Sequence, residues 1–387
     1  MDIGTSYRLG GKVLRNDIKE KIYASWLDSI CWLNRSVKHK LLSKAGSAVE
    51  IYKLSDKELL ALIGEKDAER IKVYKSKYLP ADVWEFLSKK NINYTYIKAA
   101  DFPKKLTDIP DKPFGIFYKG ELPQSDIPAV AIIGARKCSQ YGRIMAEYFS
   151  KELALSGINI ISGMALGIDG ISQSTAIKAG GKSYGVLGCG VEVIYPKENQ
   201  DLYEGLIQNG GVISEYPPMM QPNPVLFPPR NRIISAFSDA VLVVEAREKS
   251  GTLITVDMAL EQGKDVYAVP GRCSDSLSIG CNKLLRQGAG AAVTVEDFIA
   301  DMGWDKPLKK AKAEGDRKLQ KLQGVSKMAR EIYEVLEILP ISQDDIINRL
   351  RQNENTSTVS QICQGIMELE INKMIKRTSG GIRVEGI

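Results

Sequence analysis

The sequence predicts an α/β protein with a doubly wound parallel sheet and a smaller helical unit at each end of the chain. Strand-like apolar runs alternate with helical stretches through the middle of the chain, which is the pattern of a parallel sheet with helical crossovers. Before and after this region, apolar residues recur at the three- and four-residue spacing of helices. The 387 residues, of which 44% are hydrophobic, are enough for two to four domains.

The N-terminal region, residues 1–98, is expected to form a small helical domain. Residues from about 22 onward have the apolar spacing of short helices, and Ser55 precedes Glu58 as in a capping box. The stretch "CWLNRSVKHK" lacks the Gly-rich turn of a DNA-binding helix-hairpin-helix. A structural or protein-contacting role is therefore favoured for this domain.

The central region, residues 99–300, is expected to hold the sheet. Helical stretches such as 141–156 and 252–262 lie between most of its apolar runs. Crossovers of this kind join parallel strands and place helices on both faces of the sheet. The six predicted strands are 129–134, 158–163, 183–188, 211–216, 240–246 and 265–271.

The C-terminal region is predicted to be a winged helix joined to the sheet by a linker. Residues 301–325 are rich in lysine and lack apolar periodicity, which is typical of a tether. Residues 326–387 contain helical stretches followed by "MIKRTSGGIRVE", in which a Ser-Gly-Gly turn separates two strand-like segments. Three helices and a hairpin are the elements of a winged helix. The expected helices are 328–338, 342–351 and 356–370.

Composition argues against several classes of function. No charge-free run reaches about eighteen residues and the chain starts without an apolar signal region, so we expect no membrane span and a cytoplasmic protein. The six cysteines contain no C-x-x-C pair, so we expect neither a zinc site nor disulfides. His39 is the sole histidine and lies far along the chain from the Gly-rich loops, which argues against histidine-based catalysis. No metal or cofactor is expected.

The net charge of +6 is unevenly distributed. Residues 101–300 hold 22 acidic and 19 basic residues, whereas residues 1–100 hold 12 acidic and 19 basic residues. A polyanion partner is compatible with the chain, but the sheet region has no broad basic surplus. A phosphate bound there would be held by a few placed cations and by backbone N–H groups.

The loops that follow the predicted strands are the candidate binding elements, because ligands of doubly wound sheets bind at the carboxyl ends of the strands. The first loop, "GARKCSQYG", allows close approach at Gly134 and offers the planar guanidinium of Arg136 to a phosphate. The second, "SGMALGIDG", contains Ser162 and Gly163 and is a candidate anion nest. Asp169 in this loop has the alternative role of a helix cap.

Two later loops add cations. In "GCGVEVIYPKEN" the third glycine and the ribose-binding acid of a dinucleotide site are missing, and Lys197 is either a ligand contact or a solvated side chain. "FPPRNRIIS" follows a long Pro-rich connection and places Arg230 and Arg232 near the start of a helix, where an anion would offset their charge. The Ser-Gly-Thr of residues 250–252 is either an anion site or a helix cap.

These motifs, in this order, resemble the DNA-processing protein A (DprA/Smf) family. The resemblance runs through residues 100–290 and includes "SGMALGIDGISQ", "GVISEYP", "FPPRNRIISAFSDAVLVVEAREKSGTLIT" and "GCNKLLRQGA". It implies an extended Rossmann-like core between a SAM-like N-terminal domain and a winged helix. Such proteins bind single-stranded DNA, form homodimers, protect incoming strands in competence and natural transformation, and load a RecA-type recombinase for DNA recombination.

The resemblance also implies roles for individual side chains. An arginine of the first loop and lysines near the edge of the sheet contact the DNA backbone in this family, and these roles correspond to Arg136, Lys182 and Lys197. Arg230 and Arg232 belong to the family's Arg-Asn-Arg motif and are expected in the same groove. The predicted DNA-binding residues are thus Gly134, Arg136, Ser162, Gly163, Lys182, Lys197, Arg230 and Arg232.

Two other classes of function fit the sequence less well. A nucleotide-binding enzyme similar to the Rossmann-fold phosphoribohydrolases would need a glutamate where this chain has Thr255. Since the loops also lack paired carboxylates and an activated nucleophile, we expect no enzymatic activity. A sequence-specific regulator would need a basic recognition helix, but residues 356–370 contain no Lys or Arg. One departure from the family is Ser172-Gln173 in place of the usual Ala-His, so a role of that histidine does not carry over.

Overall fold

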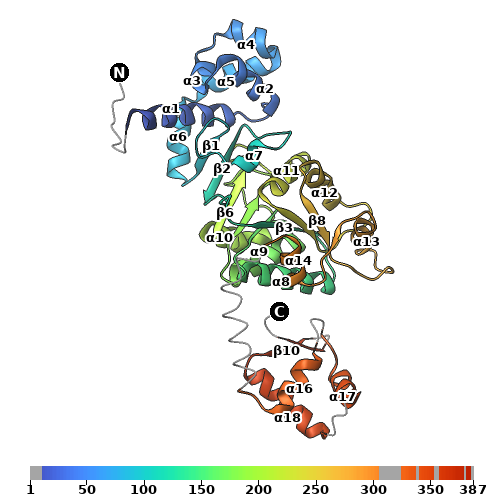
Figure 1. The fold of residues 1–387 in the computed structure, drawn as a ribbon. Helices are drawn as coiled ribbons and strands as arrows, with labels where there is room; N and C mark the ends of the chain where they lie inside the picture. Colours follow the sequence, from blue (N-terminus) through green and yellow to red (C-terminus); the bar gives the residue numbers. More distant parts are fainter. Residues whose placement is uncertain (1–10, 305–323, 337–339, 353–356, 379–380, 385–387) are drawn as a thin grey trace.

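The computed structural model describes residues 11–304, 324–336, 340–352, 357–378 and 381–384 (Figure 1). Most of the predicted linker, residues 301–325, lies outside them. The doubly wound sheet is confirmed, because the six predicted strands are present and run parallel to one another. They are β3 (Ala129–Ile133), β4 (Asn159–Ser162), β5 (Ser183–Val186), β6 (Gly210–Ser214), β7 (Ala240–Val243) and β8 (Asp265–Ala268).

Three further strands, which the sequence did not predict, extend the sheet to nine strands in the order β1-β2-β6-β5-β4-β3-β7-β8-β9. The antiparallel strands β1 (Asn93–Tyr96) and β2 (Gly115–Gly120) lie at one edge, and the short β9 (Gly290–Ala291) lies at the other. Because β1 precedes residue 98 and pairs with β2, the sheet crosses the expected boundary between the first two domains. The division into domains stays a prediction.

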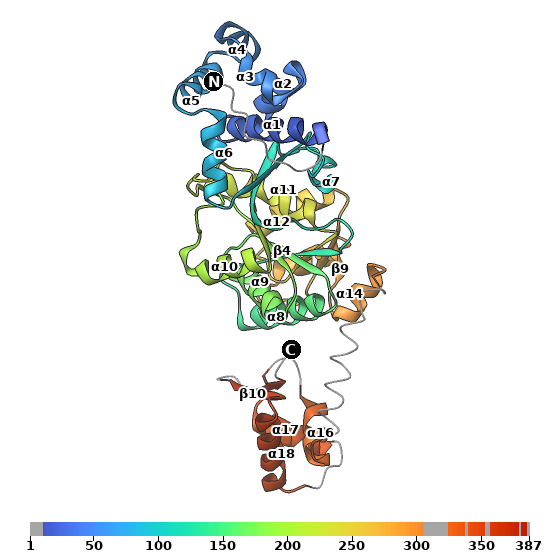
Figure 2. The ribbon, with the colours of Figure 1, turned by 90° about the vertical axis from the view of Figure 1, so that its left-hand side faces the viewer.

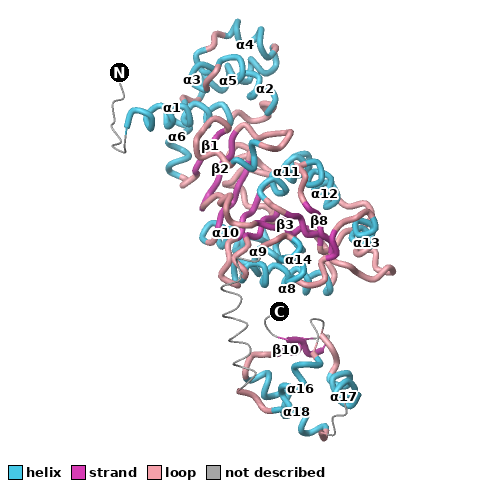
Figure 3. Tube along the Cα trace, in the orientation of Figure 1, coloured by secondary structure: helices cyan, strands magenta, loops and turns pink. Residues whose placement is uncertain are grey.

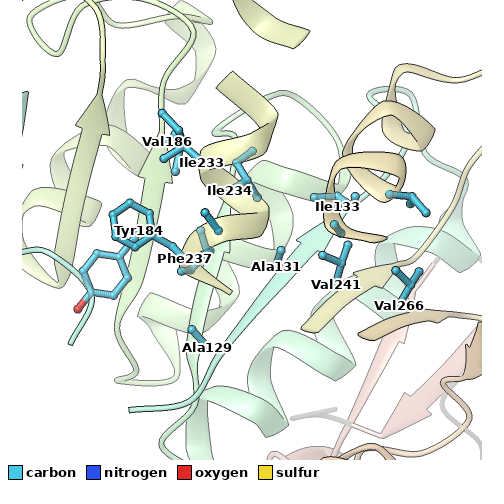
Figure 4. Close-up of a cluster of buried hydrophobic side chains, with 14 of the residues drawn as sticks. Ala129, Ala131, Ile133, Tyr184, Val186, Ile233, Ile234, Phe237, Val241 and Val266 are labelled. Atoms are coloured by element: carbon cyan, nitrogen blue, oxygen red, sulfur yellow. The ribbon is translucent and has the colours of Figure 1, made fainter. Parts of the chain in front are cut away.

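The parallel strands are buried on both sides. Along β3, Ala131 and Ile133 face one hydrophobic core, on the side of Phe237 (Figure 4), whereas Val130 and Ile132 face a second core. This alternation follows from the two-residue repeat of a β-strand. Because helices cover both faces, every residue of β3 is buried and its sequence is apolar throughout.

The helices form a layer on each face of the sheet (Figures 2 and 3). One face packs against α7 (Lys104–Thr107), α11 (Phe227–Phe237), α12 (Gly251–Glu261) and α13 (Ile279–Arg286). The other face packs against α8 (Gln140–Leu155), α9 (Ile168–Lys178) and α14 (Val295–Asp301), with α10 (Gln200–Gln208) beside α9. Two short 3₁₀ turns, η1 (Lys197–Asn199) and η2 (Pro224–Leu226), precede α10 and α11.

The N-terminal helices pack on the antiparallel edge of the sheet. Buried Trp26 belongs to a hydrophobic cluster that also contains Phe117 of β2 and Val191 of a loop after β5. The predicted capping box is present, because Ser55 and Glu58 each accept a hydrogen bond from the other's backbone N–H. The helices are α1 (Gly11–Asp28), α2 (Arg35–Ala45), α3 (Ala48–Lys53), α4 (Asp56–Ile63), α5 (Glu65–Lys77) and α6 (Pro80–Lys89).

The described residues of the C-terminal unit form three helices and one antiparallel strand pair around a hydrophobic cluster of their own. A further backbone bridge joins Ile341 to Ile382 of the second strand. These elements are the ones that a winged helix requires, and the winged-helix assignment itself stays a prediction. Among the residues that the structure describes, no helix is both long and apolar enough to cross a membrane. The elements are α16 (Lys327–Val335), α17 (Gln343–Gln352), α18 (Val359–Ile371), β10 (Ile375–Thr378) and β11 (Gly381–Val384).

Candidate functional site

A cleft of about 480 Å³ lies at the carboxyl end of β3. Its walls are the loop after β3, the Pro-rich segment that leads into α11, and the start of α12. This is the edge at which the loops of a parallel sheet converge, and the volume falls within the range of ligand sites. The residues of the cleft that bear on binding are Gly134, Arg136, Asp169, Tyr195, Phe227 and Arg230.

The loop after β3 presents Arg136 to the cleft. A Cβ at Gly134 would lie 2.7 Å from Ile168 Cγ1, so the backbone passes its neighbours at a distance that only glycine allows. The guanidinium carbon of Arg136 lies 5.7 Å from the centroid of the Phe227 ring, within the range of a cation–π contact. Arg136 is exposed, and within the described residues no carboxylate pairs with it. Its charge is therefore available to an anion.

Arg230 lies at the base of the cleft and is 5% exposed. Its Nη1 donates hydrogen bonds to the carbonyl oxygens of Gly163, at 2.9 Å, and of Val186, at the carboxyl ends of β4 and β5. Burial lowers the pKa of Arg230, and the nearby charge of Asp169 opposes this shift. Burial likewise raises the pKa of Asp169, against the charge of Arg230. Arg230 remains charged, since an arginine does not deprotonate in proteins.

Ser162 and Gly163 lie behind the cleft, and their polar groups are already used by the protein. The Ser162 hydroxyl donates to the carbonyl oxygen of Ile132 at 2.7 Å, and the Gly163 N–H donates to Asp169 Oδ2 at 3.0 Å. A Cβ at Gly163 would lie 2.6 Å from Arg230 Nη2. The two residues therefore make room for Arg230 and hold Asp169, and they do not form the open anion nest that the sequence suggested.

Lys197 lies beside the cleft, at the start of η1. It is exposed, and within the described part of the chain it has no ion-pair partner. Two residues before it, Tyr195 lines the cleft, is 42% exposed, and has its ring centroid 5.7 Å from that of Phe227. Two residues after it, the Asn199 amide donates to the carbonyl oxygens of Met164, at 3.0 Å, and Ala165. These contacts fix the segment next to the cleft.

The sheet region is similar to proteins of a known family. A family model described as DNA recombination-mediator protein A matches residues 93–303, which is more than half of the chain. The chain belongs to this family. The DNA processing protein DprA of Bacillus subtilis (strain 168) is 41% identical over 212 residues, covering 54% of this chain and 71% of that protein. The resemblance noted in the motifs is thereby confirmed.

Two further similarities concern Streptococcus pneumoniae. The DNA processing protein DprA of strain ATCC BAA-255 / R6 is 40% identical over 200 residues, which is 52% of this chain and 71% of that protein. The X-ray structure of DprA from the same species is 33% identical, has a TM-score of 0.63, and covers 72% of this chain and 97% of that chain. The family fold is thus present over most of this chain.

The structure does not bring Arg232, of the family's Arg-Asn-Arg motif, into the groove with Arg230. Residues two apart on a helix face opposite sides, and Arg232 faces the N-terminal helices. It is 4% exposed and donates to both carboxylate oxygens of Glu215, at 2.9 and 2.6 Å, and to the carbonyl oxygen of Asp111 at 2.7 Å. Arg35 of α2 reaches the same Glu215 carboxylate at 3.4 Å. Arg232 therefore anchors α11 to the rest of the fold.

The structure does not place Lys182 at the cleft either. This residue directly precedes β5, so it lies at the amino end of a parallel strand whose carboxyl end is on the cleft side. A strand of four residues spans roughly 13 Å. The Lys182 Nζ pairs with Glu121 at 2.5 Å, and both side chains are substantially exposed. The position of Lys182 therefore does not support the contact with the DNA backbone that the resemblance implied.

Gln173, which departs from the family's usual histidine, has a defined structural role. Its Oε1 accepts from the Met164 N–H at 3.0 Å and its Nε2 donates to the Tyr184 carbonyl oxygen at 2.9 Å. The side chain is fully buried and joins the loop after β4 to β5. A neutral imidazole also offers one acceptor and one donor, so Gln173 can replace a histidine as a bridge without its titration.

The aromatic residues of the cleft, Tyr195 and Phe227, were missed in the sequence. Tyr195 lies two residues before Lys197 in "VIYPKEN", and Phe227 lies three residues before Arg230 in "VLFPPRNR". An aromatic residue just before a predicted cation is the signal that could have identified them.

Thr255 is 3% exposed and lines the cleft where a phosphoribohydrolase-like enzyme would need a carboxylate. Among the described residues, no group of three His, Cys, Asp or Glu could hold a metal ion.

Proposed function

We propose that the cleft binds the backbone of single-stranded DNA, and that the protein is a binding protein and not an enzyme. The observation that carries the proposal is Arg136, an exposed guanidinium without a carboxylate partner in the described residues, at the cleft where the fold gathers its loops. Lys197 adds a second available cation beside it. Charge-assisted contacts from a few placed cations suit phosphates in a region that has no broad basic surface.

Aromatic side chains next to these cations favour single strands over a duplex. The Tyr195 ring is 42% exposed and lies beside Phe227, which itself contacts Arg136. Unpaired bases stack on exposed aromatic rings, whereas the base faces of a duplex are covered by neighbouring bases. A cleft with phosphate-binding cations and an exposed ring is therefore suited to a strand whose bases are free.

Family membership supports a role for this binding in DNA recombination. The family is described as a recombination mediator, and the relatives from Bacillus and Streptococcus are named DNA processing proteins. We therefore place the chain in the cytoplasm as a homodimer that protects incoming single strands in natural transformation and loads a RecA-type recombinase onto them. For the C-terminal unit we propose protein contact or a shape role, and not major-groove reading, because its helix α18 contains no Lys or Arg.

The test is a binding titration of the full chain without added nucleotide. Fluorescence anisotropy with labelled oligo(dT) should show binding that a duplex of equal length does not match at the same salt concentration. Tyr195→Ala should weaken single-strand binding by roughly 1 kcal/mol or more, whereas Tyr195→Phe should retain it, because stacking needs the ring and not the hydroxyl. Equal affinity for both DNA forms would refute the single-strand assignment.

A further inference from the structure

The residue that holds the Arg136 loop in place is a buried glutamate just after the neighbouring strand, β7. Glu245 follows β7 and is 2% exposed. One of its carboxylate oxygens accepts the backbone N–H of Ser139 at 2.9 Å, and the other accepts the Ser139 hydroxyl. Ser139 lies three residues after Arg136 and is the N-cap of α8. A carboxylate in the segment after β7 thus fixes the end of the loop that follows β3.

The chain leaves space for this carboxylate. A Cβ at Gly142, in the first turn of α8, would overlap the Glu245 carboxylate. A glycine inside a helix is unfavourable by roughly 1 kcal/mol relative to alanine, so its presence here accommodates a specific neighbour. The Ser139 hydroxyl, which donates to Glu245, also accepts the Gly142 N–H at 3.0 Å. Three features of the sequence therefore meet at one contact: Ser139, Gly142 and Glu245.

Glu245 is not placed there to neutralise a cation. Within the part of the chain that the structure describes, no ion pair includes it, and its hydrogen-bond donors are the two neutral groups of Ser139. Burying a carboxylate without a cation is costly, and a neutral side chain of similar size would avoid that cost. The benefit of the contact is structural. Two hydrogen bonds from Ser139 to one carboxylate fix both the position and the direction of the backbone at the end of the loop.

We propose that Glu245 is a positioning residue for DNA binding, which acts on the bound strand through the loop of Arg136. The proposal rests on the proposed function, because it assigns Glu245 a role only where Arg136 contacts phosphate. The other end of the same loop is held separately, by the hydrogen bond from the Ile168 N–H to the Ala135 carbonyl oxygen at 3.2 Å. Arg136 thus lies between a hydrogen bond to the first residue of α9 and hydrogen bonds to Glu245, just after β7.

The matched control is Asp239, at the opposite end of β7. Its Oδ2 accepts the Ala129 N–H at 2.9 Å and so fixes the start of β3. Glu245 fixes the segment after β3 in the same way, by accepting a backbone N–H. Glu245→Gln and Asp239→Asn are equivalent changes of carboxylate to amide. In each variant one oxygen can still accept, and an NH₂ group replaces the other. The two contacts differ in position, since only the Glu245 contact lies next to Arg136, and in charge, since Asp239 also pairs with Lys105 at 2.6 Å.

The experiment measures oligo(dT) affinity of the full chain over a range of salt concentrations. Glu245→Gln should weaken binding about fivefold and Asp239→Asn should leave it unchanged, because only the first loses a hydrogen bond that places Arg136. Gly142→Ala should weaken binding in the same way, since it displaces the carboxylate while Glu245 remains. In a double-mutant cycle, Arg136→Ala should have little further effect once Glu245→Gln is present. Equal losses in the two amide variants, or additive losses in the cycle, would overturn the proposal.

Amide hydrogen exchange gives a second measure that does not depend on DNA. Residues 135–142 should exchange faster in Glu245→Gln than in the wild-type protein, whereas Asp239→Asn should leave their exchange unchanged. Unaltered exchange in this loop would overturn the proposal even if oligo(dT) binds well. Failure of the wild-type protein to bind oligo(dT) would instead refute the proposed function, and with it the role of Glu245 in DNA binding. The exchange measurement would still show whether Glu245 holds the loop in place.

Discussion

Cations lie at both edges of the sheet, but they differ in their partners. At the carboxyl edge, Arg136 and Lys197 are exposed and lack carboxylate partners within the described residues. At the amino edge, Lys182 pairs with Glu121 at 2.5 Å and Lys105 pairs with Asp239 at 2.6 Å. The difference shows why the central region can hold more acids than bases and still present positive charge at one cleft. Its acids neutralise cations elsewhere.

Neighbouring arginines on α11 repeat this contrast within one helix. Arg230 donates to backbone carbonyl oxygens at the base of the cleft, whereas Arg232 is held by the Glu215 carboxylate on the other side. Both are buried, so exposure alone does not separate them. Their partners differ: Arg232 forms an ion pair with Glu215 through two hydrogen bonds, whereas Arg230 donates to carbonyl oxygens and has the charge of Asp169 nearby.

Arg232→Ala should lower the free energy of unfolding by about 3–5 kcal/mol, because it leaves the Glu215 carboxylate buried beside only Arg35. Urea unfolding followed by circular dichroism measures this loss. The paired replacement of Arg232 by Met and Glu215 by Leu should recover most of the stability, since no buried charge then lacks a partner. Folded Arg232→Ala protein should retain its oligo(dT) affinity. A stable variant that has lost DNA binding would place Arg232 in the binding site after all.

Arg136→Ala should weaken oligo(dT) binding by roughly tenfold and leave the unfolding free energy nearly unchanged, because Arg136 is exposed and forms no ion pair in the described residues. The slope of log affinity against log salt concentration should become shallower by about 0.7, as expected for one lost phosphate contact on a single strand. Arg136→Lys should keep the slope and lose part of the affinity. An unchanged slope in Arg136→Ala would separate this residue from the phosphates.

The sheet could be predicted from the sequence because its parallel strands are buried on both faces. Runs such as "AVAII" of β3 have no polar position, so their boundaries follow from hydrophobicity alone. The strands β1 and β2 were missed for the opposite reason. β1 reads "NYTY" and β2 ends in "YKG", which places polar residues among the buried ones. One of the two pairing partners of β2 is β6, about a hundred residues later. Such pairings depend on the tertiary fold.

The candidate site was only partly predictable. Gly134 and Arg136 follow a buried strand directly, so the carboxyl-edge rule places them correctly. Lys182 precedes β5 and so lies at the amino end of that strand. The same rule would therefore have excluded it from the site. The roles of Ser162, Gly163 and Arg232 depend on which polar groups already have partners, and those partners come from distant segments. Glu245 likewise contacts a residue more than a hundred positions away, so no local pattern reveals it.

Gln173→His should introduce a pH dependence of stability that the wild-type protein lacks at this position. The site requires one acceptor for the Met164 N–H and one donor for the Tyr184 carbonyl oxygen, and only a neutral imidazole supplies both. The folded-state pKa of the new histidine would therefore lie below its unfolded value of about 6.5. Stability should be unaffected above that value and should fall by up to about 1.4 kcal/mol per pH unit as the pH drops toward the folded-state pKa. Urea midpoints measured from pH 8 to pH 5 test this, with Gln173→Ala, which cannot titrate, as the control.

Lys182→Ala should have the smallest effect, and it tests the contrast between the two edges directly. The Lys182–Glu121 pair is exposed, and such pairs contribute from nothing to about 1 kcal/mol of stability. Because Lys182 lies at the amino end of β5, its loss should change neither the oligo(dT) affinity nor the salt slope. Lys197→Ala, a lysine-to-alanine change beside the cleft, should weaken binding a few-fold and make the slope shallower. If Lys182→Ala instead lost affinity as Lys197→Ala does, the bound strand would have to extend from the cleft to the opposite edge of the sheet, and the ion pair with Glu121 would have to open to receive a phosphate.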